Sequence, residues 1–302
     1  MLHPTLKKTL AFLLFLSIGL PLPVGFGGDS PGPQDCLRLT GEIKIQEFFH
    51  TLLEEKRPGT LDLENGVTAL ITPWPNDHEQ VARLVVRDGN KDVVSFRKYQ
   101  FTNCFLLEAG PVRHWIIEDW NGAAHGGCQH RYFCRAAAGE PLRFLGTIWV
   151  GDHRTDETFG PGQIRCHNSQ PFVRYDDNRF AYFETSFAES TALFFPSFYR
   201  LTPQCLVLDN RAFPEEYRQE IVKIDAEVKK NATQMQLKPK KISLGDDLGV
   251  WLVARTIHYL VLREEKRAWK SLEQDVAKYY QTKQGLAALK AKIRQRLAKS
   301  PY

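Results

Sequence analysis

HWIIEDWNGAAHGGCQHRYFC, residues 114–134, decides how the middle of this chain folds. Trp115-Ile116-Ile117 predicts a buried strand, the Asn121-Gly122 and Gly126-Gly127 pairs predict turns, and Arg131-Tyr132-Phe133 predicts the returning strand. The stretch therefore predicts a β-hairpin. Its acids, histidines and cysteines also make it the densest group of chemically active side chains in the sequence.

Short apolar runs separated by turn residues extend on both sides of this hairpin, from Thr60 to Leu208. Runs of this length, about 8 to 14 residues apart, are typical of an all-β sandwich, barrel or propeller-like array of sheets. A glycine in each of three breaks predicts hairpin turns at residues 64–66, 88–90 and 138–140. The predicted strands cover residues 67–72, 81–87, 93–99, 104–107, 114–117, 131–134, 144–150, 172–175, 180–185, 194–201 and 205–208.

Beyond Phe213 the apolar residues recur with helical spacing. Pro214-Glu215-Glu216 predicts a helix start, because proline and acids suit the first helical turn. Further helices are expected over 248–261 and 264–280, and leucines and Ile293 at spacings of three and four predict a last one over 286–297. Residues 213–302 carry 19 Lys or Arg against 11 Asp or Glu, so this helical region is basic.

The predicted fold class is therefore α+β, with a β-rich sheet domain, sandwich or propeller-like, over residues 37–212 and a small helical region over residues 213–302. Within the first part, the apolar residues of 37–55 suit a short helix better than a strand.

The first 28 residues have a basic start and an apolar run interrupted by Pro21 and Pro23. The run is about a dozen residues long, shorter than the roughly 20 of a membrane-spanning helix. It predicts an export signal peptide over residues 1–28, with an uncleaved anchor as the alternative. Residues 29–36, rich in Pro and Gly, predict a linker. We expect an exported protein, periplasmic or extracellular.

The six cysteines form an even set, and in an exported chain they are expected to form disulfides. If Gln129 to Phe133 is extended, Cys128 and Cys134 stand roughly 20 Å apart at about 3.3 Å per residue, too far to bond to each other. Their partners would be other cysteines, and the pairing stays open. The disulfide candidates are Cys36, Cys104, Cys128, Cys134, Cys166 and Cys205.

Some of the same residues could instead bind a metal. His125, Cys128, His130 and Cys134 are ligand types that zinc or copper accepts, although their spacing matches no zinc finger. Disulfides and surface histidines are the simpler interpretation, so no metal or other cofactor is predicted. The acids of Asp88-Gly89-Asn90-Lys91-Asp92 imitate a calcium loop, but a tight hairpin explains them equally well.

Four acids near aromatic residues are the weak catalytic candidates: Glu118, Asp119, Asp176 and Asp177. Two carboxylates in one groove could hydrolyse an extracellular polymer by acid–base catalysis. Neighbouring acids on a strand point to opposite faces, however, so capping of strand ends and turns is the simpler interpretation.

Binding is the preferred function, in a disulfide-stabilised binding or structural protein of the cell envelope, and hydrolysis is the alternative. The ligand-facing surface is expected around residues 118–130 and in the aromatic stretch 180–187. The candidate ligand-binding residues are Trp120, His125, His130 and Tyr182. The partner is unknown: an envelope polymer, an anionic surface or a protein would suit, whereas nucleic acid would not suit an exported protein.

Three segments carry a resemblance: 118–128 (EDWNGAAHGGC), 145–147 (LGT) and 179–188 (RFAYFETSFA). They resemble a group of uncharacterised exported bacterial proteins that are similar to β repeats of the FG-GAP or VCBS type and have a helical C-terminal part. The resemblance implies architecture and no activity. Residues 107–111 and 166–169 stand where such repeats have calcium-binding loops, and they lack the alternating aspartates and glycines.

Overall fold

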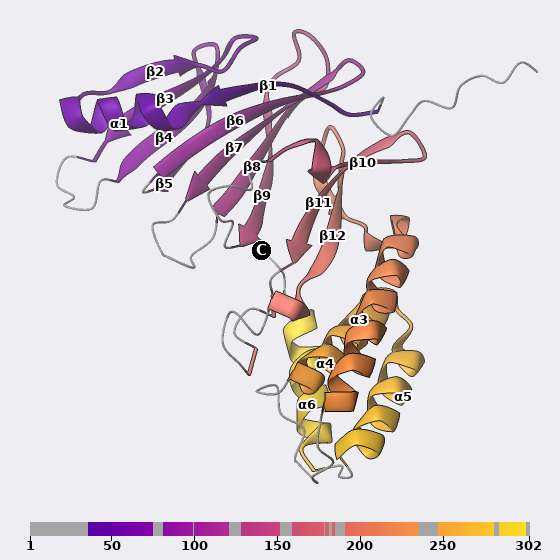
Figure 1. Cartoon of the computed structure of the whole chain (residues 1–302). Coiled ribbons are helices and arrows are strands. Elements are labelled where there is room, and N and C mark those ends of the chain that lie inside the picture. The colour runs from indigo at the N-terminus through magenta and orange to yellow at the C-terminus, as the bar shows by residue number, and fades with distance from the viewer. Residues whose placement is uncertain are drawn as a thin grey trace, which may run out of the picture. The chain divides into compact units, whose positions relative to one another are not determined.

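From Arg38 to Leu208 the described residues form mainly antiparallel strands, and from Pro214 onward they form helices, as the α+β prediction requires (Figure 1). The structure is a computed structural model. It describes residues 36–74, 81–98, 100–120, 128–151, 159–177, 179–180, 183–184, 191–234, 247–280 and 284–299, all of which belong to one compact unit, Pro33–Tyr302.

A five-stranded antiparallel sheet in the order β1-β6-β7-β8-β9 carries the 114–134 hairpin as β7 and β8. β1 pairs with β6, although a whole second sheet lies between them in sequence, so the two run side by side in Figure 1. The strands are β1 (Arg38–Lys44), β6 (Gln100–Ala109), β7 (Val112–Trp120), β8 (Cys128–Arg135) and β9 (Arg143–Gly151).

Two four-stranded antiparallel sheets accompany it. All three predicted hairpin turns are present, with Gly66, Gly89 and Gly139 at positive φ, where a side chain would be strained. A propeller arrangement is not confirmed. The first of these sheets contains β2 (Gly59–Asp62), β3 (Val67–Pro73), β4 (Ala82–Asp88) and β5 (Lys91–Lys98); the second contains β10 (Ile164–His167), β11 (Gln170–Asp177), β12 (Phe195–Leu201) and β13 (Leu206–Leu208).

Alternate residues of β7 divide between two hydrophobic cores. Trp115 and Ile117 pack with α1 (Ile45–Glu55) and the β2–β5 sheet, whereas Ile116 packs with the β10–β13 sheet. Successive side chains of a strand point to opposite faces, so the five-stranded sheet lies between the other two. The central hairpin is therefore covered on both faces.

The helical region forms a third core with the far side of the β10–β13 sheet. Phe172 and Phe198 of that sheet join Leu252 and Ile257 in this core, so apolar packing crosses residue 213, where the secondary structure changes. The helices are α3 (Pro214–Gln234), α4 (Asp247–Val261), α5 (Glu265–Asp275), which continues as a π-helical turn (Val276–Tyr280), and α6 (Leu286–Ala298).

α4 is buried over most of its length, as expected for the central helix of a bundle. Its Arg255 guanidinium reaches two neighbouring helices, with Nη1 2.7 Å from the Asp225 carboxylate on α3 and Nη2 paired to Asp275 on α5. A buried cation that is paired twice ties α3, α4 and α5 together.

Two sequence predictions are wrong. Residues 38–44 form β1, not the start of a helix, because Leu39 and Ile43 satisfy the two-residue period of a strand as well as a four-residue helical spacing. Phe180 and Phe183 lie in turn and bend backbone rather than in a strand, and both side chains are buried in the helical core.

Candidate functional site

The β7–β8 register brings together residues that the sequence keeps apart. Glu118 lies directly opposite His130, and Trp120 lies opposite Cys128. Cys128 and His130 are two residues apart on β8, so they point to the same face as Glu118. We call these three residues, Glu118, Cys128 and His130, the polar cluster.

Hydrogen bonds fix both side chains of the central pair. His130 Nε2 is 2.8 Å from Glu118 Oε2, and His130 Nδ1 is 2.6 Å from the hydroxyl of Tyr175 on β11. Glu118 Oε1 accepts from Thr102 Oγ1 at 2.5 Å and from Asn103 Nδ2 at 3.2 Å. The polar cluster thus connects β6, β7 and β8 with the neighbouring sheet.

The electrostatics of the polar cluster favour one negative charge. Burial alone would raise the pKa of Glu118, but the hydrogen bond and charge of His130, with the bonds from Thr102 and Asn103, lower this pKa to about 2. Burial and the nearby Glu118 and Asp119 carboxylates raise the pKa of the Cys128 thiol well above its usual range. At neutral pH the cluster therefore holds a carboxylate beside a protonated thiol.

Asp119 belongs to a different ionic group on the opposite face of β7. Its carboxylate pairs with Arg131 and lies 3.5 Å from Lys98 Nζ, and the Arg131 guanidinium stands 3.9 Å over the ring of Phe96. Glu118 and Asp119 therefore have separate partners and do not face one groove, in agreement with the alternation of a strand.

The second pair of acids is also divided. Asp177 is buried and bound by Arg179 Nε at 2.9 Å and Ser197 Oγ at 3.2 Å, whereas Asp176 has a 59% exposed side chain that pairs with Arg174. These contacts explain both acids as structural. The geometry of the described residues gives the hydrolase alternative no support.

Only two of the six candidate cysteines form a disulfide. Cys36 and Cys166 form a disulfide, whereas Cys104, Cys128, Cys134 and Cys205 are free thiols, of which only Cys205 is exposed. One pair of the six disulfide candidates is therefore bonded, and four are free. Cys104 and Cys128 lie in hydrophobic cores, and burial raises the pKa of Cys104 and of Cys134.

The predicted ligand-facing surface is only partly exposed. Trp120 has 37% of its surface exposed, but His130 has only 1%, and Phe180 and Phe183 are core residues. His125 and Tyr182 lie outside the described residues. His130 therefore belongs to an internal hydrogen-bond network and not to an open surface, so its prediction as a surface ligand contact is wrong.

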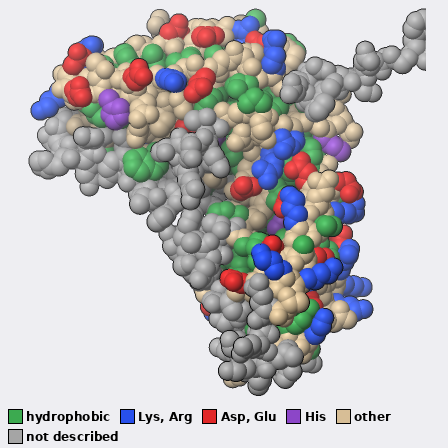
Figure 2. Space-filling view, viewed as in Figure 1, with side chains coloured by type: hydrophobic (Ala, Val, Ile, Leu, Met, Phe, Trp, Pro, Cys, Tyr) green, Lys and Arg blue, Asp and Glu red, His purple; other side chains and the backbone are tan. Residues whose placement is uncertain are grey.

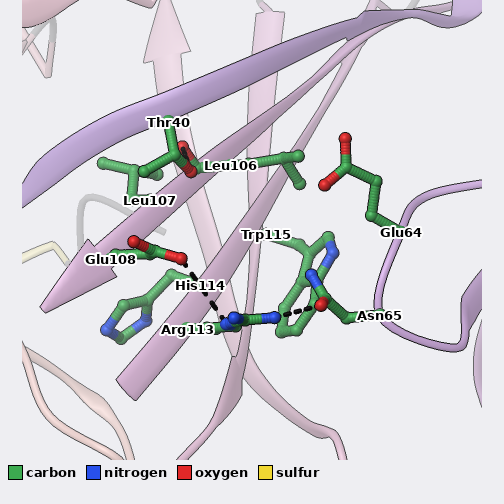
Figure 3. A pocket seen from close by; sticks show the side chains of 9 residues that line it. All are labelled: Thr40, Glu64, Asn65, Leu106, Leu107, Glu108, Arg113, His114 and Trp115. Carbon is green, nitrogen blue, oxygen red and sulfur yellow. Dashed lines mark hydrogen bonds and ion pairs between the residues drawn. The ribbon is translucent and has the colours of Figure 1, made fainter. Parts of the chain in front are cut away.

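A cavity of about 180 Å³ lies near the other end of β7, at His114 and Trp115 (Figure 3). Arg113 crosses its wall between two partners, with an ion pair of 3.5 Å to Glu108 and a hydrogen bond to the Asn65 side chain. Glu64 and Asn65 both have positive φ in the β2–β3 turn, a strained conformation for residues with side chains.

His114 is one of the residues that line this cavity, and its side chain carries an unpaired polar atom. Its ring is 2% exposed, and its Nδ1 has no hydrogen-bond partner among the described residues. Burial lowers the pKa of His114 to about 4, so the imidazole is neutral at physiological pH. A buried, unpaired nitrogen costs free energy unless a ligand or water bonds to it.

A second cavity of about 570 Å³ adjoins the first. The two share Asn65, Glu108 and Arg113, and the second adds Arg135, whose guanidinium binds the Asp88 carboxylate at 2.5 Å. We call the two together the His114 cavity. Asp88 is thus held by arginine and not in calcium-ligand geometry, and the tight hairpin explains its sequence.

The basic helical surface has mixed charge. Figure 2 shows Lys and Arg side chains gathered over the helical part of the chain, with acids among them. Lys223, Lys230 and Arg267 each pair with a glutamate one helical turn away, at 2.6 to 3.1 Å. Such exposed pairs weaken the attraction to an anionic surface.

The sequence pointed to the polar cluster but missed the residues that orient it, Tyr175, Thr102 and Asn103. It also missed the His114 cavity. The only signals for the cavity were Arg113 and Glu108, which flank the β6–β7 turn, and the Glu64-Asn65-Gly66 turn.

No family model, curated protein or solved structure matches this chain. The resemblance to exported bacterial β-repeat proteins therefore stays a prediction. In the part of the chain that the structure describes, every helix is too short or too polar to span a bilayer.

Proposed function

We propose that this chain is an exported, disulfide-stabilised protein of the cell envelope that binds a small, hydroxyl-rich ligand, such as a sugar unit of an envelope polymer, in the His114 cavity. The polar lining of this cavity, in which Arg113 already pairs with Glu108 and Asn65, is the observation that carries the proposal. Ligand hydroxyls can donate hydrogen bonds to the carboxylates of the wall and accept them from its guanidinium and amide groups.

The chemistry of the cavity wall supports a neutral ligand. Glu64 and Glu108 are balanced by Arg113 and Arg135, so the wall has no excess charge to attract an ion. Carboxylates, guanidinium groups and the Asn65 amide offer many hydrogen-bond donors and acceptors in a small space. Hydroxyl groups can satisfy both kinds.

Two features support export. The N-terminal residues have the pattern of a signal peptide. The disulfide between Cys36 and Cys166 is a bond that persists in oxidising compartments and is rare in the cytosol.

The test is calorimetric titration of the purified chain with three neutral sugars, glucose, galactose and N-acetylglucosamine. We expect saturable binding of at least one sugar to the wild type. The His114→Phe variant, which enlarges a side chain of the cavity wall and removes its polar atoms, should lose at least about tenfold in affinity, equivalent to about 1.4 kcal/mol.

Trp120→Ala is the matched control, because Trp120 lies at the opposite end of β7 on the surface that the sequence predicted for binding. Retained affinity in Trp120→Ala and reduced affinity in His114→Phe would assign binding to the cavity. The reverse result, or no heat with any of the three sugars, would contradict the proposal.

A further inference from the structure

The polar cluster has the composition and proximity of a metal site. One oxygen of Glu118, the sulfur of Cys128 and one nitrogen of His130 all lie within 4.8 Å of one another. All three residues are buried, and each comes from a paired strand whose backbone is fixed by the sheet. The donors therefore sit on a rigid scaffold.

We propose that Glu118, Cys128 and His130 bind one divalent transition-metal ion of the zinc class. Carboxylate, thiolate and imidazole are the donors that such ions accept, and three protein ligands leave a fourth position for water or another ligand. The site is independent of the His114 cavity, which lies at the other end of β7.

The distances need only a small adjustment. Metal–ligand distances of about 2.0 to 2.3 Å in a tetrahedron place the donor atoms roughly 3.3 to 3.8 Å apart. Glu118 Oε2 and His130 Nε2 are 2.8 Å apart, so they must separate by less than about 1 Å. The Cys128 sulfur already lies within 4.8 Å of the other two donors, and side-chain rotation can complete the geometry without moving the strands.

The surrounding hydrogen bonds suit a ligand set. Tyr175 holds His130 Nδ1, which directs Nε2 toward Glu118 and Cys128. Thr102 and Asn103 hold Glu118 Oε1, which leaves Oε2 on the side of the histidine. Orientation of the ligating histidine and carboxylate by outer hydrogen bonds is a regular feature of metal sites.

The charges also balance. The ion replaces the thiol proton of Cys128, which leaves to water, so the site gains a thiolate beside the Glu118 carboxylate. The imidazole proton moves from Nε2, which binds the ion, to Nδ1, which then donates to the Tyr175 hydroxyl. Two negative ligands and a neutral imidazole neutralise a divalent cation, which removes the cost of burying a net charge. The cations Lys98 and Arg131 are engaged with Asp119 on the opposite face and do not compete.

The experiment loads the untagged full mature chain, with its disulfide intact, with Zn²⁺ or Co²⁺. Elemental analysis after gel filtration gives ions per chain, and a thiolate-to-cobalt charge-transfer band in the near ultraviolet reports a Co–S bond. We expect one ion per wild-type chain and the band with Co²⁺. Cys128→Ser should lose the band, and Glu118→Gln, which keeps the side-chain shape, should weaken binding by about tenfold or more.

Cys134→Ser and Cys205→Ser are the controls, one a buried thiol on the same strand and the other an exposed thiol. Both should keep the band, and so should His114→Phe, whose altered cavity concerns only sugar binding. If Cys128→Ser fails to fold, Glu118→Gln still decides the matter through the Zn²⁺-dependent rise in thermal midpoint, which it should lack. A folded wild type without bound ion, or an unchanged band in Cys128→Ser, would show that the polar cluster is only a hydrogen-bond network.

Discussion

Tyr175 is the single residue through which the β10–β13 sheet takes part in the polar cluster. Its hydroxyl meets both His130 Nδ1 and the hydroxyl of Tyr132, and all three side chains are almost completely buried. A buried polar group that loses its partner costs about 1 to 3 kcal/mol. Loss of the Tyr175 hydroxyl should therefore destabilise the fold even when the aromatic ring is kept.

Tyr175→Phe should lower the free energy of unfolding by about 1 to 3 kcal/mol, because it leaves His130 Nδ1 without a partner. Urea unfolding measures the change. Tyr279→Phe is the control, since the Tyr279 hydroxyl binds only the exposed Lys278, and this variant should stay within about 0.5 kcal/mol of the wild type. Equal effects of the two substitutions would contradict the role of Tyr175.

His114 predicts a pH dependence of stability. Burial lowers the folded-state pKa of His114 from 6.5 to about 4, so the unfolded chain takes up a proton at higher pH than the folded chain does. The stabilisation is therefore complete above pH 6.5 and is lost as the pH falls toward 4, by about 3 kcal/mol in total.

The His114→Phe variant should lose this part of the pH dependence. Glu64, Glu108 and Arg113, the charged residues that line the same cavity, remain in the variant, so the difference between the two proteins reports on the imidazole. Chemical unfolding at pH 7, 5.5 and 4 measures it. The slopes of the unfolding free energy against pH should differ most between pH 6.5 and 4. Parallel curves for the two proteins would exclude a contribution of His114 to the pH dependence.

At this scale the sequence identified individual residues better than their partners. Glu118, Cys128 and His130 stood out by residue type, but the opposition of Glu118 and His130 depends on the hairpin register, which residue types alone do not specify. Tyr175 is 45 residues from His130 in sequence, so only tertiary structure could associate them.

Among the secondary-structure elements, α1 packs closely against β2 because Gly59 has no side chain. A Cβ atom there would lie 2.6 Å from Leu52 Cδ2 and 2.9 Å from Phe48 Cζ, both on α1. Leu52 is completely buried and has little room to move. The junction between this helix and this strand therefore depends on a glycine.

Gly59→Ala should destabilise the fold by about 1 to 3 kcal/mol, as overpacking of a core does. The control is Gly162→Ala, because a Cβ atom at Gly162 meets no atom within 4 Å. Thermal unfolding of the two variants provides the comparison. A Gly59→Ala protein as stable as the Gly162→Ala protein would mean that α1 moves freely over β2.

Helices of the C-terminal region were predicted well because each one repeats its apolar residues over several turns, as Leu286, Leu289 and Ile293 do on α6. The helix prediction for residues 38–44, which form β1, was wrong because seven residues are too few to separate a period of two from a period of 3.6. The short β2 and β10 were missed, since four residues carry almost no periodic signal.

At the scale of the whole molecule, three cores in succession join the sheets and helices. The β10–β13 sheet contributes Val173 and Tyr175 to one core and Phe172 and Phe198 to the next. The sequence could not predict this sharing, because composition and charge change at residue 213 while the packing continues across it.

The disulfide should contribute strongly to global stability. It closes a loop of 130 residues between Cys36 and Cys166, and removal of such a bond costs about 2 to 5 kcal/mol. Cys36→Ser should show this loss in denaturant unfolding, whereas Cys205→Ser should not, because Cys205 is exposed and unpaired. A Cys36→Ser protein of wild-type stability would argue against the bond.

Alkylation counts the thiols directly. After denaturation without reductant the mature chain should take up four alkyl groups, and after reduction it should take up six, as measured by mass spectrometry. Six groups without reductant would indicate a reducing compartment and would contradict export.

The position of the disulfide also determines how the molecule would respond to tension. Cys36 comes two residues before β1, the edge strand that pairs only with β6 in its sheet. A pull on the chain ahead of Cys36 would reach the β10–β11 hairpin through the sulfur atoms before it could unzip β1 from β6. A protein tethered by its N-terminal end would thus carry mechanical load on the β10–β11 hairpin and keep β1 in place.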